Sequence, residues 1–577
     1  MNFQRGLPPL LFLLVFQSVQ PGSSFAAAPD LRFGAMTHFA HGWDPVWAEI
    51  AGLRGIRAVR DELYWDAVER EKGVFVFPRP FDGYMDALRR NGIDPLIVLS
   101  FENRNYDGGD TPHSPEAISA FGRYGTEVLK RYGTQIQTVE IWNEYNGSFC
   151  KGPATLDRAG TYSKMLRESY AQIKKLRPDV TVLGGATAGI SLPYWEKLMQ
   201  SGGLDAMDAL SIHPYRYNAP PEGLETEITW LQALVKKYNG GQPKPVWVTE
   251  IGWGLQSGAQ PGALAIDEGT QAKFLVRACA LLLSAGIERV YWYLFRDYED
   301  FTMGLTTADA RPKLASFAMQ VMVSELSGAR FVRREASLPS LYSLLFVRSG
   351  GEEVRVMWAL QPASIASLGA TRVVDLEGRS LALSAQLSLH DAPVFVSGTL
   401  AALPAPPAAA ETVLADSRSG FSSEQGGNGW SYGESIGANP TFHSLAKYTV
   451  SDWNAAWGGV HAYLSITSGD QHPSVTGDGT PVSVLRRWTS DRTGAVHLVG
   501  EFRCGVGGDG VGVSILVNGR PAFRRWLGGG NGNDIVMTFD LEERVAPGTT
   551  IDFAVDPGPG NDISYDATQV SASISVR

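Results

Sequence analysis

Two short segments of this chain place a glutamate at the end of an apolar, β-branched run. One is VEIWNEYNG, which carries Asn143 and Glu144, and the other is PVWVTEIGW, which carries Glu250. A carboxylate costs several kcal/mol to bury without partners, so a chain with two of them at predicted strand ends is expected to use them. One such glutamate alone would be a helix cap or half of a surface ion pair. Two in the same setting favour catalysis, because strand-end residues of α/β barrels carry function.

A pair of carboxyl groups is the machinery that hydrolyses a glycosidic bond. One carboxylic acid protonates the leaving oxygen, and the other attacks as a nucleophile or activates water. A retaining pair stands about 5–5.5 Å apart and an inverting pair about 6.5–9.5 Å apart, and both arrangements stay open at this stage. The acid needs burial or a neighbouring anion to remain protonated, whereas the nucleophile needs a cation or several hydrogen-bond donors.

Other polar and aromatic residues stand at the same predicted strand ends. Arg60 in IRAVRDEL could keep the nucleophile ionised, or form a plain salt bridge with its acidic neighbours. Asn143 could donate to a sugar hydroxyl or form a turn. His213 and Tyr215 in SIHPYRY could hydrogen-bond the nucleophile or the substrate. Trp292 in VYWYLF could stack on a sugar face or pack in the core. Because side chains alternate along a strand, either Trp292 or the two flanking tyrosines face the barrel, and the other set faces the helices.

The pattern that must position these residues alternates strand and helix from Phe33 to about Arg330. Amphipathic stretches with apolar spacing near 3.6 residues, clearest at 115–133, 160–178 and 312–328, separate the strands. Eight such pairs predict an α/β fold of the (β/α)8 TIM-barrel type, with function at the carboxyl ends of the strands. An open doubly wound sheet is the alternative, but the first turn, AHGWDPVW, lacks a Gly-rich phosphate loop. The predicted strands are 33–39, 56–62, 94–101, 139–145, 180–187, 209–215, 246–253 and 289–297.

The segment before the barrel predicts an exported protein. In residues 1–28, Arg5 supplies a positive charge, 7–16 (LPPLLFLLVF) form an apolar core, and 26–28 (AAA) fit a signal-peptide cleavage site. The apolar core is far shorter than the ~20 residues of a spanning helix, so we expect no membrane span. We therefore expect the protein to be secreted or periplasmic.

The segments after the barrel domain (29–330) predict further β-structure. Alternating short runs in 331–400 predict a small β-sandwich domain. The Pro/Ala-rich stretch 401–411 is typical of a linker. The Gly-, Asp- and Asn-rich segment 412–577 predicts an all-β, jelly-roll-like module, a candidate carbohydrate-binding module. Its tryptophans could bind glycans or fill its core, and the core is favoured. They are Trp430, Trp453, Trp457 and Trp488.

Composition and motif searches exclude several other classes of protein. The formal net charge is −10, and no basic stripe suggests nucleic-acid binding. The three cysteines lie too far apart for a disulfide framework. No GxSxG, HExxH, CxxC or Walker A pattern occurs, so we expect neither a cofactor nor a metal site. The aspartates of GNDISYDATQ (560–569) could bind calcium, but we expect this run to form solvated turns.

Six ordered motifs resemble those of glycoside hydrolases of clan GH-A, and most of all family 39 and its exopolysaccharide-cleaving bacterial relatives. The resemblance extends from Phe33 to about Arg330. It rests on RDELYWDAVEREKGVF, LSFENRNYDGGDTP, EIWNEYNGSF, LSIHPYRY, VWVTEIGW and VYWYLFRD, in that order. These motifs are specific to the clan and less specific to a substrate.

The resemblance implies a role for each site residue. Glu144 matches the acid/base and Glu250 the nucleophile, while Arg60 matches the arginine that contacts the nucleophile. Asn143 matches the residue that holds the sugar 2-hydroxyl. The other implied substrate contacts are Asn103, Tyr106, His213, Tyr215 and Trp292. Relatives often have Pro after the Asn-Glu pair, and since Tyr145 follows here we expect an altered loop shape.

The function expected from the residues and the resemblance is that of an exported retaining β-glycosidase. Its partner would be a carbohydrate, either a polysaccharide or an oligosaccharide, and no cofactor would be needed. Two alternatives remain open. One is a glycan-binding or matrix protein with a catalytically silent barrel, because fold does not guarantee function. The other is a transglycosylase that uses the same residues.

Overall fold

The computed structural model describes residues 30–576, apart from 31, 218, 256–263, 265, 336–339, 368, 400–411, 438–440, 452–454, 505–507 and 529–535. The predicted signal peptide (1–28) and linker (401–411) lie outside the described residues, and the domain boundaries drawn from them remain predictions. None of the described helices is long and apolar enough to cross a membrane.

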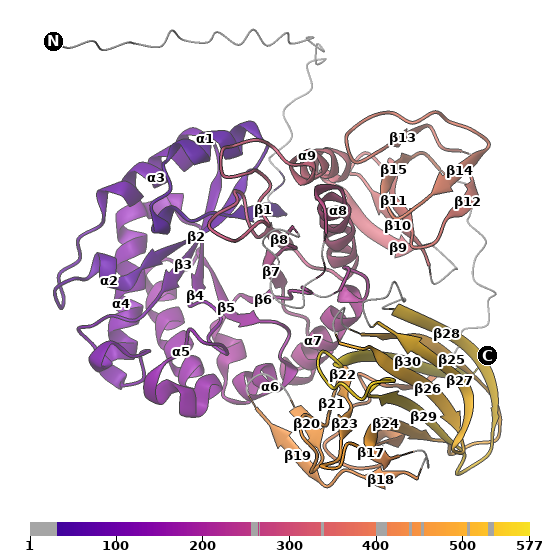
Figure 1. Ribbon diagram of the computed structural model, residues 1–577. Helices are drawn as coiled ribbons and strands as arrows, with labels where there is room; N and C mark the ends of the chain where they lie inside the picture. The colour runs from indigo at the N-terminus through magenta and orange to yellow at the C-terminus, as the bar shows by residue number, and fades with distance from the viewer. Residues whose placement is uncertain are drawn as a thin grey trace, which may run out of the picture.

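A closed barrel of eight parallel strands forms the first part of the molecule (Figure 1). Each strand pairs with the next in chain order, and β8 closes the barrel against β1. All eight predicted strands are confirmed, and closure excludes the doubly wound sheet. The strands are β1 Phe33–Met36, β2 Ala58–Tyr64, β3 Asp94–Ser100, β4 Thr138–Ile141, β5 Thr181–Ala188, β6 Ala209–His213, β7 Val246–Ile251 and β8 Arg289–Trp292.

Helices surround the barrel strands, and the three clearest periodic stretches are α4, α5 and α9. In α4 the Ser114 side chain accepts from the backbone N–H of Ala117, Pro115 occupies the first turn and Gly133 follows the last residue. The helices are α1 Val46–Leu53, α2 Trp65–Val68, α3 Arg79–Arg90, α4 Pro115–Tyr132, α5 Arg158–Leu176, α6 Leu192–Gln200, α7 Leu224–Tyr238, α8 Glu268–Ser284 and α9 Leu314–Leu326. Short 3-10 turns in this part are Phe39–His41, Asp107–Gly109, Gly133–Gln135, Gly152–Asp157 and Gly203–Ala206.

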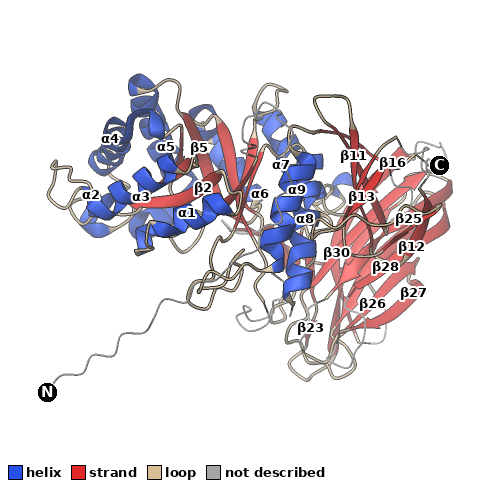
Figure 2. Cartoon of the chain, turned by 90° about the horizontal axis from the view of Figure 1, so that it is seen from above, coloured by secondary structure: helices blue, strands red, loops and turns tan. Residues whose placement is uncertain are grey.

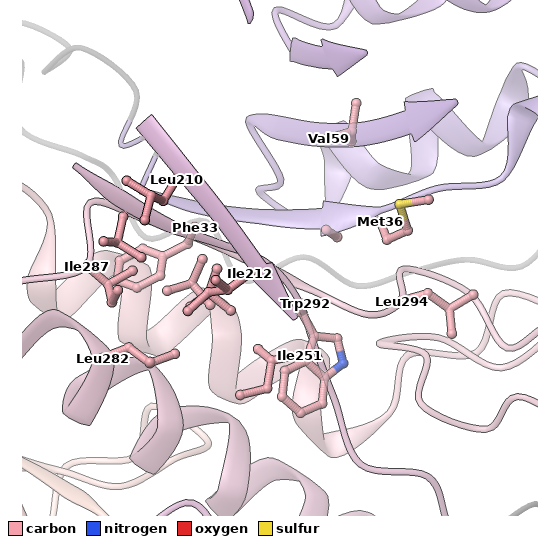
Figure 3. Close-up of a cluster of buried hydrophobic side chains, with 14 of the residues drawn as sticks. Phe33, Met36, Val59, Leu210, Ile212, Ile251, Leu282, Ile287, Trp292 and Leu294 are labelled. Atoms are coloured by element: carbon pink, nitrogen blue, oxygen red, sulfur yellow. The ribbon is translucent and has the colours of Figure 1, made fainter. Parts of the chain in front are cut away.

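Alternation along the strands divides the core into an interior and an outer layer. Tyr291 belongs to the cluster inside the barrel, whereas Trp292, the next residue, belongs to the outer cluster between strands and helices. Figure 3 shows Trp292 beside Ile251 in this outer layer, with Leu282 and Ile287 from the helical side. The interior cluster consists of Ala58, Leu96, Val98, Leu183, Ala209, Trp247 and Tyr291.

A small antiparallel domain follows the barrel, as predicted for the segment after residue 330. Its larger sheet has the order β13-β15-β11-β10-β9, and β12 pairs with β14 in a second sheet. The strands are β9 Arg330–Arg334, β10 Leu341–Val347, β11 Glu353–Ala359, β12 Ala363–Ala366, β13 Arg372–Val374, β14 Gln386–Leu389 and β15 Val394–Ser397.

Two larger antiparallel sheets form the C-terminal module and share one hydrophobic core. In Figure 2 these strands and the small domain lie on one side of the molecule, with the barrel helices on the other. Trp430, Trp457 and Trp488 are buried in that core, as favoured from sequence, and Trp453 lies outside the described residues. The strands are β16 Thr412–Asp416, β17 Trp430–Ile436, β18 His443–Ser444, β19 Lys447–Val450, β20 Ala455–Gly458, β21 Ser465–Thr467, β22 Asp470–His472, β23 Ser474–Val475, β24 Pro481–Thr489, β25 Gly494–Arg503, β26 Val511–Val517, β27 Arg520–Leu527, β28 Val536–Val545, β29 Thr550–Asp556 and β30 Thr568–Val576.

A buried carboxylate joins the barrel to the small domain. Glu222, between β6 and α7, accepts hydrogen bonds from both Nε and Nη2 of Arg277 on α8. The indole N–H of Trp358 on β11 donates to the same carboxylate at 3.0 Å. All three side chains are buried, so the hydrogen bonds from Arg277 and Trp358 replace the water that the Glu222 carboxylate loses on burial.

We expect Glu222→Ala to lower the free energy of unfolding by about 3–5 kcal/mol, because the guanidinium of Arg277 stays buried without its partner. Glu352→Ala serves as the control, since the Glu352 side chain is 72% exposed in its pair with Arg348 and such pairs contribute about 0–1 kcal/mol. Urea denaturation followed by fluorescence measures both. Equal losses of unfolding free energy in the two variants would contradict the role assigned to Glu222.

Candidate active site

A cavity of about 330 Å³ lies at the carboxyl ends of the barrel strands. Residues that end or follow β1, β2, β3, β4, β6, β7 and β8 line it, as the barrel fold predicts for a functional site. The lining residues are Met36, His38, His41, Glu62, Tyr64, Phe101, Asn143, Glu144, Phe149, Tyr215, Tyr217, Glu250, Tyr293, Phe301 and Met303.

The two glutamates singled out in the sequence meet in this cavity. One oxygen of Glu144, one oxygen of Glu250 and one ring nitrogen of His213 all lie within 4.8 Å of one another. The Nδ1 atom of His213 is 3.0 Å from Oε1 of Glu144 and 3.8 Å from Oε1 of Glu250. The carboxylates from β4 and β7 therefore face the same small volume.

Both oxygens of Glu250 accept hydrogen bonds from fixed donors. Nη1 of Arg60 donates to Oε1 at 2.5 Å, and the Tyr215 hydroxyl donates to Oε2 at 2.7 Å. Burial, and next the charge of Glu250, raise the pKa of Tyr215 well above its usual value. The phenol therefore stays protonated as a donor, and the two donors fix the orientation of the Glu250 carboxylate.

Arg60 is completely buried and is shared between two carboxylates. Its Nε and Nη2 donate to Glu140 at 2.9 and 3.0 Å, and Nη2 also donates to Oδ1 of Asn143 at 2.8 Å. Burial alone would lower the pKa of Arg60, but the charges of Glu140 and Glu250 outweigh it and raise that pKa. The alternative of a salt bridge with the residues next to Arg60 is wrong, because its ion pairs are with Glu140 and Glu250.

Glu140 is the functional residue that sequence reasoning missed. It lies inside β4, fully buried, where it pairs with Arg60 and accepts from Oγ of Ser211 at 3.0 Å. Its strand neighbours Val139 and Ile141 belong to the outer hydrophobic cluster, so Glu140 points into the barrel. The available signal was a single charged residue within the apolar run TVEI, which a strand buried on both faces does not tolerate without a partner.

A chain of hydrogen bonds determines which nitrogen of His213 carries a proton. Because the Ser211 hydroxyl donates to Glu140, the Thr249 hydroxyl, 2.6 Å from that of Ser211, must donate to Ser211. The Thr249 oxygen then accepts from Nε2 of His213 at 3.0 Å. The Nδ1 atom is left facing Glu144, so this contact holds one proton between the ring and the carboxyl group.

The backbone after β4 turns sharply to present Asn143 and Glu144. Trp142 and Glu144 both have positive φ, at 69° and 45°, which is uncommon for residues with a side chain. Tyr145 is fully buried and packs against Trp142 and Tyr162. The side chain that replaces the frequent proline thus anchors this loop in the core.

Five of the predicted substrate contacts are not among the residues that line the cavity. Arg60 and His213 still contact the two glutamates, whereas the other three are engaged elsewhere in the fold. The amide of Asn103 donates to the backbone oxygen of Glu69 at 2.9 Å, and the Tyr106 hydroxyl donates to the Glu69 carboxylate at 2.7 Å. Trp292 is fully buried, and its indole N–H donates to the backbone oxygen of Met303 at 2.7 Å. The positions of Asn103, Tyr106 and Trp292 therefore do not support a contact with sugar, because their polar groups already form hydrogen bonds within the protein and the Trp292 ring is buried.

Residues outside the predicted set occupy one wall of the cavity instead. His41 lies 2.6 Å from the Tyr64 hydroxyl, which donates to Glu62 at 2.8 Å. The hydrogen bond to Glu62 raises the pKa of His41 against the effect of burial. Burial, and then the charge of His41, lower the pKa of His38 to about 4, so its ring is neutral beside the Tyr293 hydroxyl at 3.2 Å. This wall offers polar groups that suit sugar hydroxyls.

Solved structures resemble this chain, although neither a protein-family model nor a curated protein matches it. A family 39 glycoside hydrolase from the gut symbiont Bacteroides cellulosilyticus WH2 is 23% identical, with 64% of this chain and 81% of that chain covered and a TM-score of 0.56. A GH39 β-xylosidase from Caulobacter crescentus is 18% identical, with 65% and 98% covered and a TM-score of 0.47. The first match confirms, at the level of the fold, the resemblance expected from the six motifs.

The environment of His213 predicts a pH-dependent stability. Burial opposes its charge, but the charge of Glu250 and the hydrogen bond to Glu144 outweigh burial and raise the pKa of His213 above 6.5. The folded chain therefore binds this proton more tightly than the unfolded chain, and the stabilisation is complete below pH 6.5 and lost as pH rises through the folded-state pKa.

We expect the difference in unfolding free energy between the native chain and His213→Gln to shrink as pH rises from 6 to 9, by at most about 1.4 kcal/mol per pH unit. In a Glu250→Gln background the same difference should vary less with pH, because a main source of the raised pKa is absent. Denaturant titrations at each pH measure it. A difference that grows with pH would contradict the account.

Proposed function

We propose that this protein is a glycoside hydrolase that cleaves a β-glycosidic bond with net retention at the anomeric carbon. The observation that carries the proposal is the approach of Glu144 and Glu250, whose oxygens lie within 4.8 Å inside one cavity. A retaining pair stands about 5–5.5 Å apart, whereas an inverting pair needs about 6.5–9.5 Å to admit a water molecule between acid and base. The observed separation favours retention.

The surroundings of the two carboxyl groups assign their roles. Glu250 faces a guanidinium and a phenol, whose hydrogen bonds fix its orientation as the nucleophile. Glu144 is hydrogen-bonded to His213, and the contact between them holds one proton. The Glu144 side chain is 21% exposed against 9% for Glu250, so it is better placed to meet a leaving group and then water.

The first half of the reaction forms a covalent sugar–enzyme ester. An oxygen of Glu250 bonds to the anomeric carbon as the bond to the leaving oxygen breaks, and Glu144 transfers its proton to that oxygen. The Asn143 amide assists from the cavity wall: because its oxygen accepts from Arg60, its N–H₂ is the end that meets a sugar hydroxyl.

The second half releases the sugar. Glu144, now a carboxylate, takes a proton from water, and the water oxygen attacks the anomeric carbon from the face that the leaving group vacated. The bond to Glu250 breaks, and Glu250 returns to its contacts with Arg60 and Tyr215. Two displacements at one carbon restore its original configuration, and the proton that Glu144 gives to the leaving oxygen is replaced by the proton that it takes from water.

We propose a polysaccharide or oligosaccharide outside the cytoplasm as the substrate. The features that support it are the signal-peptide pattern of residues 1–28 and the aromatic rings of the cavity. Phe149 and Tyr217 are each 38% exposed, and Phe149 stacks on Phe101. Flat rings that remain partly exposed suit the apolar faces of further sugar units beyond the cleaved bond.

Proton NMR during hydrolysis tests the proposal. The full-length protein is incubated with a panel of aryl β-glycosides and with bacterial exopolysaccharides, and the anomeric signals are followed from the first turnover. We expect the β-anomer of the product to form first and the α-anomer to grow only by mutarotation. Initial α-product would contradict a retaining mechanism, and binding without any product would favour the glycan-binding alternative.

Substitution of the two glutamates should have different effects on different leaving groups. Glu144→Gln removes the general acid, so we expect a loss of about 10²–10⁴-fold in kcat/KM for alkyl or sugar leaving groups and a much smaller loss for nitrophenyl groups, which need no proton. Glu250→Gln removes the nucleophile and should abolish turnover of both kinds of substrate.

A matched control for these variants is Glu102→Gln. Glu102 also follows a barrel strand, β3, but it pairs with Lys151 and lies outside the cavity lining. Its substitution should leave kcat/KM within about twofold of the native value, because only a surface ion pair is lost. Steady-state kinetics with the same substrates measures all three variants. A Glu250→Gln variant with native activity would overturn the assignment.

A further inference from the structure

The side chain of Asp566, in the loop between β29 and β30 of the C-terminal module, is buried without a hydrogen bond to the described part of the chain. The residue is 1% exposed, and neither Oδ1 nor Oδ2 has a partner there. Oδ1 of Asp509, in the loop between β25 and β26, is likewise buried without a partner, while its Oδ2 accepts from the backbone N–H of Gly560. Two carboxylates thus present three unsatisfied oxygens in one part of the module.

Glycines bring these two loops into close contact. A Cβ on Gly508 would lie 2.3 Å from the backbone oxygen of Ser564 and 3.9 Å from Oδ1 of Asp566. A Cβ on Gly558 would lie 2.0 Å from the backbone oxygen of Gly510 and 3.5 Å from Oδ1 of Asp509. The approach therefore gathers carboxylate and carbonyl oxygens, and no side chain separates the loops at these points.

The charges around Asp566 are negative. Burial, and then the charges of Asp509, Asp562 and Asp556, raise the pKa of Asp566 to about 8. Among the described residues, no ion pair involves Asp509, Asp562 or Asp566, and Asp556 is 3.5 Å from Arg524. The nearby basic residue Arg503 pairs with Glu501.

Protonation alone does not satisfy this arrangement. A neutral Asp566 would have one O–H to donate, but its second oxygen would still lack a donor among the described residues. A bound cation would satisfy both oxygens and offset the repulsion between the aspartates.

We propose that Asp509 and Asp566, together with the backbone oxygens of Gly510 and Ser564, bind a calcium ion. Carboxylate and carbonyl oxygens are the donors that Ca²⁺ takes, in numbers and geometries that loops can supply. The expectation of solvated turns for GNDISYDATQ holds for the exposed Asp562 and is revised for Asp566.

Calorimetric titration of the full-length protein with CaCl₂, after removal of metals with EDTA and dialysis, tests the proposal. We expect saturable binding at one site, at least tenfold weakened in Asp566→Asn and unchanged in Asp491→Asn, a control whose Asp491 side chain is 79% exposed. Parallel titrations use MgCl₂ and ZnCl₂, and both should bind more weakly than calcium. The readout does not depend on hydrolysis.

Thermal melts distinguish loss of the site from loss of the fold. Calcium should raise the melting temperature of the native chain and of Asp491→Asn but not of Asp566→Asn. Without metal, Asp566→Asn should melt no lower than the native chain, because the substitution removes an unpaired buried carboxylate. If Asp566→Asn does not fold, Asp509→Asn replaces it with the same expectation. No calcium binding to the native chain, unchanged binding in the variant that folds, or tighter binding of zinc would overturn the proposal.

Discussion

The guanidinium of Arg60, buried between Glu140 and Glu250, is the interaction on which the site depends. A buried cation is stable only with well-placed anions, and here three of its nitrogens each donate to a carboxylate oxygen. Since Arg60 comes from β2, Glu140 from β4 and Glu250 from the end of β7, the contact forms only when the barrel closes with these strands in register. The same contact that stabilises the barrel interior therefore also orients Glu250, the proposed nucleophile.

One strand supplies three different parts of this arrangement. Glu140 lies in the regular part of β4 and points inward as the anchor of Arg60. Beyond the strand, the left-handed backbone at Trp142 and Glu144 departs from strand alternation, so Asn143 and Glu144 both reach the cavity. Residues four apart in sequence therefore have different partners: Glu140 pairs with the guanidinium of Arg60, and Glu144 shares a proton with His213.

The features that sequence predicts well here are those set by local pattern. Most barrel strands are short apolar runs bounded by turns. Glu144 follows such a run and Glu250 lies near the end of one, so the strand count and the carboxylate pair could be inferred. Glu140 lies within such a run, where its charge indicates that it has a partner but nothing local identifies that partner as Arg60. Whether Trp292 points into the barrel or toward the helices depends on which face of the four-residue strand β8 it occupies. That face is set by how β8 pairs with β1 and β7.

Contacts between distant segments account for the other differences. Asn103 and Tyr106 bind Glu69, more than thirty residues away, so the loop after β3 folds back on the chain and leaves the cavity. The burial of Asp566 depends on contact with a loop more than fifty residues earlier. The local run of aspartates and glycines does not reveal that contact. Sequence pattern thus locates charged groups at strand ends, and packing between segments determines which of them meet.

The most direct test of the central claim is to trap the covalent intermediate. The protein is incubated with 2-deoxy-2-fluoro glycosides that carry a good leaving group, digested, and mapped by mass spectrometry. If Arg60 and Tyr215 hold Glu250 as the nucleophile, one sugar per chain will be attached to the peptide that contains Glu250, and Glu250→Gln will carry none. Attachment to Glu144, or continued hydrolysis of ordinary substrates with no attachment to Glu250, would contradict the account.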